Sequence, residues 1–331
     1  HFPPNHIMCA VAHRRGRRTR VSSLNRFDFH LALDEGGSVT QPEQQGVQLR
    51  QVLQAARFHF PRNVALSLPE EHCFQLTIGI QQPDAATSLT EAVRWEAAQH
   101  LPYEMNELIM DWTTVGAEKN TVLIQVCAAP KTLVESYCAL FDAAGYTAIA
   151  IEPASRAAAR TLALPEPDPL VCIVLGESST TLAVIMGASV PLTINSEHCT
   201  DASITDLFQK KLHLSAHDAD KAKMVCGFDP SVNRGEVRTA LMDALRGLLA
   251  DITATQNFLT DHDAAMALRG IVLTGPGALV KYIDRELAQQ THLPVFLHPP
   301  RKDVLIAHVP PREMPTQMAE YAFPIGAALH R

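Results

Sequence analysis

The sequence lacks several features that would assign it to a familiar class. Its 331 residues contain no run of about 18 apolar residues, the length that a membrane-spanning helix needs. The first residues do not have the pattern of a signal peptide. Seven cysteines are an odd number, and no two have the close spacing of a zinc knuckle or a redox motif. We therefore expect a cytoplasmic protein with reduced cysteines, whose contact with a membrane is peripheral.

Catalytic and metal-binding motifs are absent as well. No pair of histidines has His-x-x-x-His spacing within a predicted helix, so no metal site is expected. Neither a Gly-x-Ser-x-Gly turn nor a plausible Cys–His pair indicates nucleophilic catalysis. The formal net charge of −7 does not indicate a nucleic-acid partner, because phosphate backbones are bound by clustered Lys and Arg. The basic run from Arg14 to Arg20 is either a solvated strand edge or turn, or a contact for anionic lipid.

The residues that are present indicate a folded α/β protein. A hydrophobic fraction of 47% excludes a disordered chain, and the length is sufficient for two domains. Residues 170–182 combine an apolar run, a Gly-Glu-Ser-Ser turn and a second apolar run, which predicts a hairpin. Its tip offers backbone N–H groups and small hydroxyl side chains, which are typical of a phosphate-binding loop. The tip residues are Gly176, Ser178, Ser179 and Thr180. The alternative is an ordinary core hairpin.

The hairpin nevertheless lacks a carboxylate that nucleotide chemistry needs. Such sites place an acid just before the turn glycine, where it holds Mg²⁺ through water. Val174 stands at that position here. The stretch therefore has the shape of a nucleotide loop without the acid that would support hydrolysis.

The half before the hairpin predicts a compact sheet-and-helix module. Residues 74–80 alternate between apolar and polar side chains, as in a strand with one buried face. Ser88 and Glu91 form a capping box at the start of a helix that Pro102 ends. Strands over 107–115 and 121–128 follow. A helix over 131–144 ends at Gly145, and a strand over 147–151 follows it. A proline-rich joint over 165–169 separates this half from the hairpin.

The half after the hairpin is mainly helical. Helices are predicted over 203–212, 216–225 and 234–259, and the last carries a continuous apolar stripe that indicates core. A buried strand from Gly270 ends in a glycine turn, Gly275-Pro-Gly277, that opens a helix. A final helix covers 317–330.

Several stretches in this order resemble the PilM family of actin-like type IV pilus assembly proteins, which are related to FtsA. Three stretches resemble the inserted module of that family. They are Arg94-Trp-Glu-Ala-Ala-Gln-His-Leu-Pro-Tyr103, Asp111-Trp112 and Ala129-Pro-Lys-Thr-Leu-Val-Glu135. Further on, Ala219-Asp-Lys-Ala-Lys223 resembles the family's Ala-Glu-x-x-Lys motif, and Leu273-Thr-Gly-Pro-Gly-Ala278 its adenosine turn. Ile325-Gly-Ala-Ala-Leu329 resembles its closing helix.

The resemblance implies a two-lobed actin-like (ribonuclease H-like) fold with an inserted small SHS2-type α/β subdomain. Residues 1–71 and 147–167 would form the first lobe (1A), closed by the C-terminal helix 317–331. Residues 72–146 would form the inserted subdomain (1C). The second lobe (2A) would comprise 168–200 and 266–316, and a helical subdomain (2B) would comprise 201–265.

The resemblance also implies a function and two sites. The protein would be a cytoplasmic adaptor of a type IV or competence pilus, peripheral to the inner membrane, with self-association into a ring. Its partner would be the N-terminal peptide of a PilN-like membrane protein, framed by Arg94, Trp95, Leu101, Pro102 and Tyr103. A vestigial nucleotide site in the interlobe cleft would contain Gly176, Ser178, Ser179, Thr180, Asp220, Lys223, Gly275 and Gly277.

Departures from the family pattern argue against a cofactor. The nearest candidate for the family's first phosphate loop is Cys9-Ala-Val-Ala-His13, which has neither the acid nor the glycines. Thr200-Asp201 replaces a glycine pair, and Pro276 replaces a glycine of the adenosine turn. We therefore expect no catalysis and no bound cofactor, with ATP and Mg²⁺ as the alternative.

Two alternative functions remain open at this stage. One is an active ATPase or small-molecule kinase of the actin and sugar-kinase superfamily. Asp201, Asp220 and Glu177 lie near the inferred cleft, but none stands where the family places its metal-holding acid. The other alternative is a GspL-like cytoplasmic domain of type II secretion.

Overall fold

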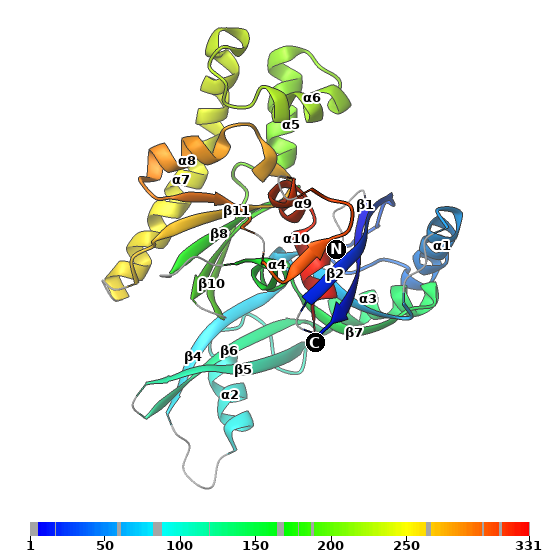
Figure 1. Ribbon diagram of the computed structural model, residues 1–331. Coiled ribbons are helices and arrows are strands. Elements are labelled where there is room, and N and C mark those ends of the chain that lie inside the picture. Colours follow the sequence, from blue (N-terminus) through cyan, green and yellow to red (C-terminus); the bar gives the residue numbers. More distant parts are fainter. Residues whose placement is uncertain are drawn as a thin grey trace.

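The computed structural model describes residues 6–16, 18–57, 61–81, 88–118, 120–163, 169–177, 179–186, 189–262, 266–299, 301–310 and 313–330. These residues form a first lobe, a second lobe and an inserted module (Figure 1). Helices α5 and α6 of the second lobe lie at one end of the molecule, and helix α2 of the inserted module lies at the other.

The second lobe is built on the hairpin that the sequence predicts. Strand β8 (Leu170–Leu175) pairs antiparallel with β9 (Thr180–Met186), which pairs with β10 (Ser189–Ser196). On the other side of β8 lie β11 (Gly270–Thr274) and β12 (Val295–Leu297), in parallel. Every residue of β8 is buried, because alternate side chains enter two different hydrophobic cores.

Helices of the second lobe share one hydrophobic core with this sheet. They are α5 (Asp201–Leu212), α6 (Ala216–Val225), α7 (Glu236–His262) and α8 (Ile283–Thr291). The predicted apolar stripe of the long helix lies in this core, with Val237, Leu245 and Leu248 fully buried. A short 3₁₀ turn, η2 (Val232–Gly235), precedes α7.

The first lobe contains two separate small sheets. Strands β1 (His6–Arg15) and β2 (Arg18–Asp28) form an antiparallel hairpin, and β13 (Val304–Ile306) pairs with β2. Strands β3 (Asn63–Leu68) and β7 (Thr147–Pro153) pair in parallel. The domain boundaries predicted from the sequence assign residues 304–306 to the second lobe. In the structure these residues form β13, which belongs to the sheet of β1 and β2. The helices of the first lobe are α1 (Pro42–Ala55), α3 (Lys131–Ala144), α4 (Ala154–Thr161), α9 (Met314–Glu320) and α10 (Ala322–Ala328).

The nearest candidate for the family's first phosphate loop, Cys9–His13, is part of a strand. These residues lie in the middle of β1 and pair with β2, so they make no turn. An irregularity in the register between Val11 and Ala12 is the only departure from regular pairing there. The absence of the acid and of the glycines agrees with a strand interior at this place.

The inserted module is a three-stranded antiparallel sheet with one helix. Strands β4 (Phe74–Gln81), β6 (Thr121–Pro130) and β5 (Leu108–Glu118) lie in that order, and helix α2 (Leu89–Ala98) packs against them. The predicted capping box is present, because Ser88 Oγ accepts the N–H of Glu91 at 3.3 Å and Glu91 accepts the N–H of Ser88. Pairing of Leu192 with Leu76 joins β10 to β4 and makes one eight-stranded sheet across both units.

The closing helix is interrupted where the sequence predicts one continuous helix. α9 and α10 meet at Tyr321, whose φ of −107° and ψ of 24° are not helical. Pro324 has no N–H, so the hydrogen bond that would reach back across the junction to Glu320 is missing. Gly145 has the left-handed conformation predicted for the end of α3, with φ of 91°.

Candidate functional site

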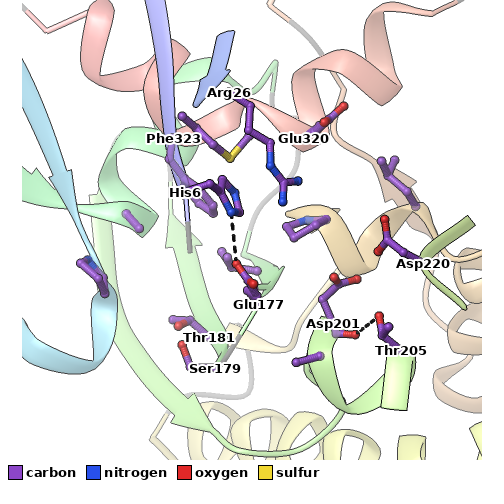
Figure 2. A pocket seen from close by; sticks show the side chains of 18 of the residues that line it. His6, Arg26, Glu177, Ser179, Thr181, Asp201, Thr205, Asp220, Glu320 and Phe323 are labelled. Atoms are coloured by element: carbon purple, nitrogen blue, oxygen red, sulfur yellow. Dashed lines mark hydrogen bonds and ion pairs between the residues drawn. The ribbon is translucent and has the colours of Figure 1, made fainter. Parts of the chain in front are cut away.

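A cavity of about 580 Å³ lies between the two lobes and contains the predicted phosphate loop (Figure 2). Strands β1 and β2 contribute His6 and Arg26 from the first lobe. The 3₁₀ turn η1 (Glu70–His72), which follows β3, lines it as well. The second lobe contributes the β8–β9 tip and residues of α5 and α6.

The structure brings part of the predicted nucleotide set together. Gly176, Ser179, Asp220 and Lys223 line the cavity. Three others are not among its lining residues: Thr180, Gly275 and Gly277. Ser178 lies outside the described residues.

The β8–β9 tip has the predicted compact turn. The N–H of Gly176 donates to the carbonyl of Ser179 at 3.0 Å. A Cβ at Gly176 would lie 2.6 Å from the same carbonyl oxygen, so only glycine closes the turn without a clash. Val174 lines the cavity and offers it a hydrocarbon surface where a metal-binding site would need a carboxylate.

Helix α5 begins beside this tip, but its first N–H groups are already engaged. Those of Asp201 and Ala202 donate to the carbonyl oxygens of Gly176 and Glu177 at 2.8 and 3.0 Å. The next two N–H groups donate to Thr200. The N–H of Ser203 donates to its hydroxyl at 3.1 Å, and the N–H of Ile204 donates to its carbonyl at 3.0 Å. A helix N-terminus binds anions through free N–H groups, and this first turn has none to offer.

Lys223, the lysine of the stretch that resembles the Ala-Glu-x-x-Lys motif, is also engaged by the chain itself. Its Nζ lies 2.5 Å from Asp201 Oδ1, 2.7 Å from Asp220 Oδ1 and 3.1 Å from the Thr205 hydroxyl. The lysine side chain is almost fully buried. Burial raises the pKa of Asp201, although the Lys223 ammonium opposes that shift. The positive charge of this lysine is therefore neutralised by the chain itself.

Acidic side chains outnumber basic ones around the cavity. The carboxyl groups that line it are those of Glu70, Glu71, Glu177, Asp201, Asp220 and Glu320. Arg26 and Lys223 are the permanent cations among the lining residues. Burial lowers the pKa of His6 to about 4, so its imidazole is neutral at pH 7, and burial raises the pKa of both Glu70 and Glu320. One of the two permanent cations is already paired and Val174 offers no ligand to a metal, so the residues present do not fit ATP with Mg²⁺.

The glycine turn after β11 serves internal packing. Gly275 has φ of 86°, and a Cβ there would lie 2.6 Å from the carbonyl oxygen of Leu175. Its N–H donates to the carbonyl of Ala319 at 3.0 Å. At Gly277 a Cβ would lie 2.8 Å from the Leu175 side chain. Both glycines therefore allow η4 (Pro276–Leu279) to approach β8 and α9 closely.

The predicted partner residues lie on the inserted module. Arg94, Trp95, Pro102 and Tyr103 are exposed, and the ring of Tyr103 lies 5.6 Å from that of Phe74. Leu101 differs from the others, because it is 8% exposed and belongs to the hydrophobic core of the module. Four of the five residues are thus available at the surface.

Two further features are absent from the residues that the structure describes. Within those ranges, no three side chains of His, Cys, Asp or Glu converge as metal ligands. In the part of the chain that the structure describes, no helix is long and apolar enough to cross a bilayer.

Sequence reasoning missed several residues of the cavity. Glu70, Glu71, His6 and Arg26 had no motif to mark them, because they come from a short turn and from strand ends that only the fold brings to the hairpin tip. One weak signal was available, since two adjacent glutamates follow the apolar run over 64–68 and Pro69. Asp201 and Glu177 were placed near the cleft, and both line it.

Comparison with known proteins identifies relatives of this fold. The family model described as type IV pilus assembly protein PilM matches residues 29–331. A solved PilM-PilN type IV pilus biogenesis complex contains a chain with a TM-score of 0.74 and 18% identity, covering 98% of this chain and 95% of the other. The two-lobed actin-like fold expected from the sequence is thereby confirmed.

Two more distant structures are also similar. Ethanolamine utilization protein EutJ from Carboxydothermus hydrogenoformans has a TM-score of 0.46 and 12% identity, covering 99% of this chain and 90% of that one. MreB5 of Spiroplasma citri bound to ADP has a TM-score of 0.47 and 15% identity, covering 82% of this chain and 74% of that one.

Proposed function

The chain belongs to the PilM family of type IV pilus assembly proteins, and we propose that it is an adaptor for a PilN-like membrane protein. It binds the short cytoplasmic N-terminal peptide of that partner, which holds it at the inner membrane. Support comes from the family match over residues 29–331 and from the similar solved structure, which is a PilM-PilN complex. Self-association into a ring stays a prediction of the sequence.

The exposed face of α2 is the observation that carries the proposed contact surface. Val93 and Ala97 are fully buried on one side of the helix, whereas the Trp95 side chain is 70% exposed on the other. An indole left in water is a large apolar area that a partner can bury, and tryptophan is over-represented among residues that dominate binding energy. Arg94 stands beside it on the exposed side and adds a donor for backbone or carboxylate oxygens of a peptide.

Neither ATPase nor kinase activity is part of this proposal. Phosphoryl transfer needs a carboxylate-held metal and donors aimed at the phosphates. The chain has Val174 at the position of the acid, and its first-turn N–H groups and its lysine are engaged by its own atoms. The GspL-like alternative would share the fold, and the choice of partner peptide in the experiment separates the two.

The experiment is calorimetric titration of the chain with a synthetic N-terminal peptide of a PilN-like protein. We expect binding that Trp95→Ala weakens at least about tenfold, as truncation of an interface anchor does. The control is Val225→Ala on α6, at a side chain that is 66% exposed on the second lobe. This variant should bind as the unchanged chain does.

Two results would contradict the proposal. One is no measurable binding of the peptide by a folded chain. The other is equal weakening by Trp95→Ala and Val225→Ala, because the contact surface would then not lie on the inserted module. Preference for the corresponding peptide of a type II secretion partner would support the GspL-like alternative instead.

A further inference from the structure

The hydroxyl of the phosphate-loop serine is bound by a carboxylate of the opposite lobe. Ser179 Oγ, at the β8–β9 tip of the second lobe, donates to Oε2 of Glu71 at 2.5 Å. Glu71 belongs to η1, between β3 and β4 on the other side of the cavity. A carboxylate and a phosphoryl group are both anions that accept hydrogen bonds through oxygen, so the two groups compete for such a donor.

The turn that carries Glu71 is held by its buried neighbour. The carboxyl of Glu70 accepts the N–H of Ser155 and the hydroxyl of the same serine, each at 2.9 Å, at the start of α4. It also accepts the side-chain amide of Gln75 at 2.5 Å. Three hydrogen bonds within the core leave η1 little freedom, so Glu71 is presented to the loop in a defined position.

A second contact crosses the cavity beside the first. His6 Nδ1 of β1 lies 3.6 Å from Oε2 of Glu177, the residue after the turn glycine (Figure 2). Glu177 therefore directs its carboxylate into the space between the lobes, where it repels any further anion. Glu177 and Ser179 of the loop thus both face side chains of the first lobe.

We propose that Glu71 is an internal anion for the phosphate loop, so that the two lobes are held together by a side-chain carboxylate rather than by a nucleotide. Ser179 is its donor, and Glu70 is the residue that positions it. The two lobes are then joined at the loop without a nucleotide, and the surface of the inserted module does not depend on one for its arrangement. This inference is independent of the proposed partner, because it is tested without one.

Hydrogen exchange of the full chain tests the contact between Glu71 and Ser179. In Glu71→Ala we expect the amides of residues 175–180 to exchange at least about tenfold faster, because a hydrogen bond to a charged group across the cavity is lost. Glu71→Gln keeps an acceptor oxygen and should retain most of the protection. Glu135→Ala, at an exposed glutamate of α3, is the matched control and should exchange like the unchanged chain.

A double-variant cycle makes the test specific. Ser179→Ala should reproduce the faster exchange, and combining it with Glu71→Ala should add nothing, because both changes remove one contact. Fully additive effects would overturn the proposal. It would also be overturned by unchanged exchange in Glu71→Ala, or by slower exchange of the loop in the unchanged chain when Mg²⁺ and ATP are added.

Discussion

The Nζ atom of Lys223 lies 2.5 Å from Oδ1 of Asp201, and both side chains are largely buried beside the interlobe cavity. Asp201 occupies one of the two positions at which a glycine pair is expected from the family pattern. The carboxylate at this position forms an ion pair with Lys223, so the ammonium is not available to another anion. The pair therefore has a structural role at this position.

The first prediction concerns the stability of this pair. Lys223→Met leaves the buried carboxylate of Asp201 without its nearest cation, and we expect a loss of about 3–5 kcal/mol in the free energy of unfolding. Asp201→Asn combined with Lys223→Met should lose less than the sum of the two single changes. Urea denaturation measures both, and additive losses would show that the two groups are not coupled.

A second prediction is the pH dependence that His298 confers. Its Nε2 lies 2.8 Å from the Thr161 hydroxyl of α4, and its Nδ1 lies 3.0 Å from the Thr274 hydroxyl of β11. Burial lowers the pKa of this imidazole from its ordinary value of 6.5 to about 3. Between these values the unfolded chain binds a proton that the folded chain does not. Stability from this residue is therefore complete above pH 6.5 and falls as the pH drops toward 3.

The loss from His298 amounts to about 2 kcal/mol between pH 6.5 and pH 5, since each pH unit contributes about 1.4 kcal/mol. Urea denaturation of the unchanged chain and of His298→Gln at both pH values isolates it. His6 shifts in the same direction, and it is present in both proteins. Equal pH dependence of the two proteins would contradict the assignment.

A third prediction concerns the glycine of the closing-helix motif. A Cβ at Gly326 would overlap the carbonyl of Ala157, because α10 lies directly on α4. The backbone of α4 cannot move away freely, so we expect Gly326→Ala to cost about 1–3 kcal/mol or more. At Gly36 a Cβ would meet only the Asp34 side chain at 3.4 Å, so Gly36→Ala is the control. Thermal denaturation with similar midpoints for the two variants would contradict this prediction.

A fourth prediction separates binding from folding on the inserted module. Trp95→Ala removes an exposed side chain and should change the free energy of unfolding by less than about 0.5 kcal/mol. Ile124→Ala, at a fully buried position in the core of the same module, should cost about 2–5 kcal/mol. Chemical denaturation measures both. A large loss in Trp95→Ala would mean that this indole supports the fold rather than a partner.

The fifth prediction concerns nucleotide. A ligand at a hundred times its Kd would raise the stability of the folded chain by about 2.7 kcal/mol. We expect no shift of the melting curve at millimolar ATP, with or without Mg²⁺, because the first N–H groups of α5 and the Lys223 ammonium are engaged by the chain itself. A shift that requires Mg²⁺ would contradict this and would indicate a functional nucleotide site.

The sequence alone determined the local elements of this protein. The β8–β9 hairpin, the capping box at Ser88 and the left-handed end of α3 at Gly145 each depend on residues within a few positions of one another. Hydrogen bonds and side-chain periodicity over such short distances are properties of the chain segment itself, so their patterns can be read directly. The missing acid at Val174 was visible for the same reason.

Only the tertiary structure decided what the loop binds. Ser179 and Glu71 are 108 positions apart, and Lys223 and Asp201 are 22 apart on different helices. No pattern along the chain states which carboxylate reaches which donor, because that depends on how the lobes pack and which groups lose contact with water. The sequence shows Val174 where a phosphate-binding loop would carry an acid, and the packing of the two lobes shows that the Glu71 carboxylate accepts a hydrogen bond from Ser179.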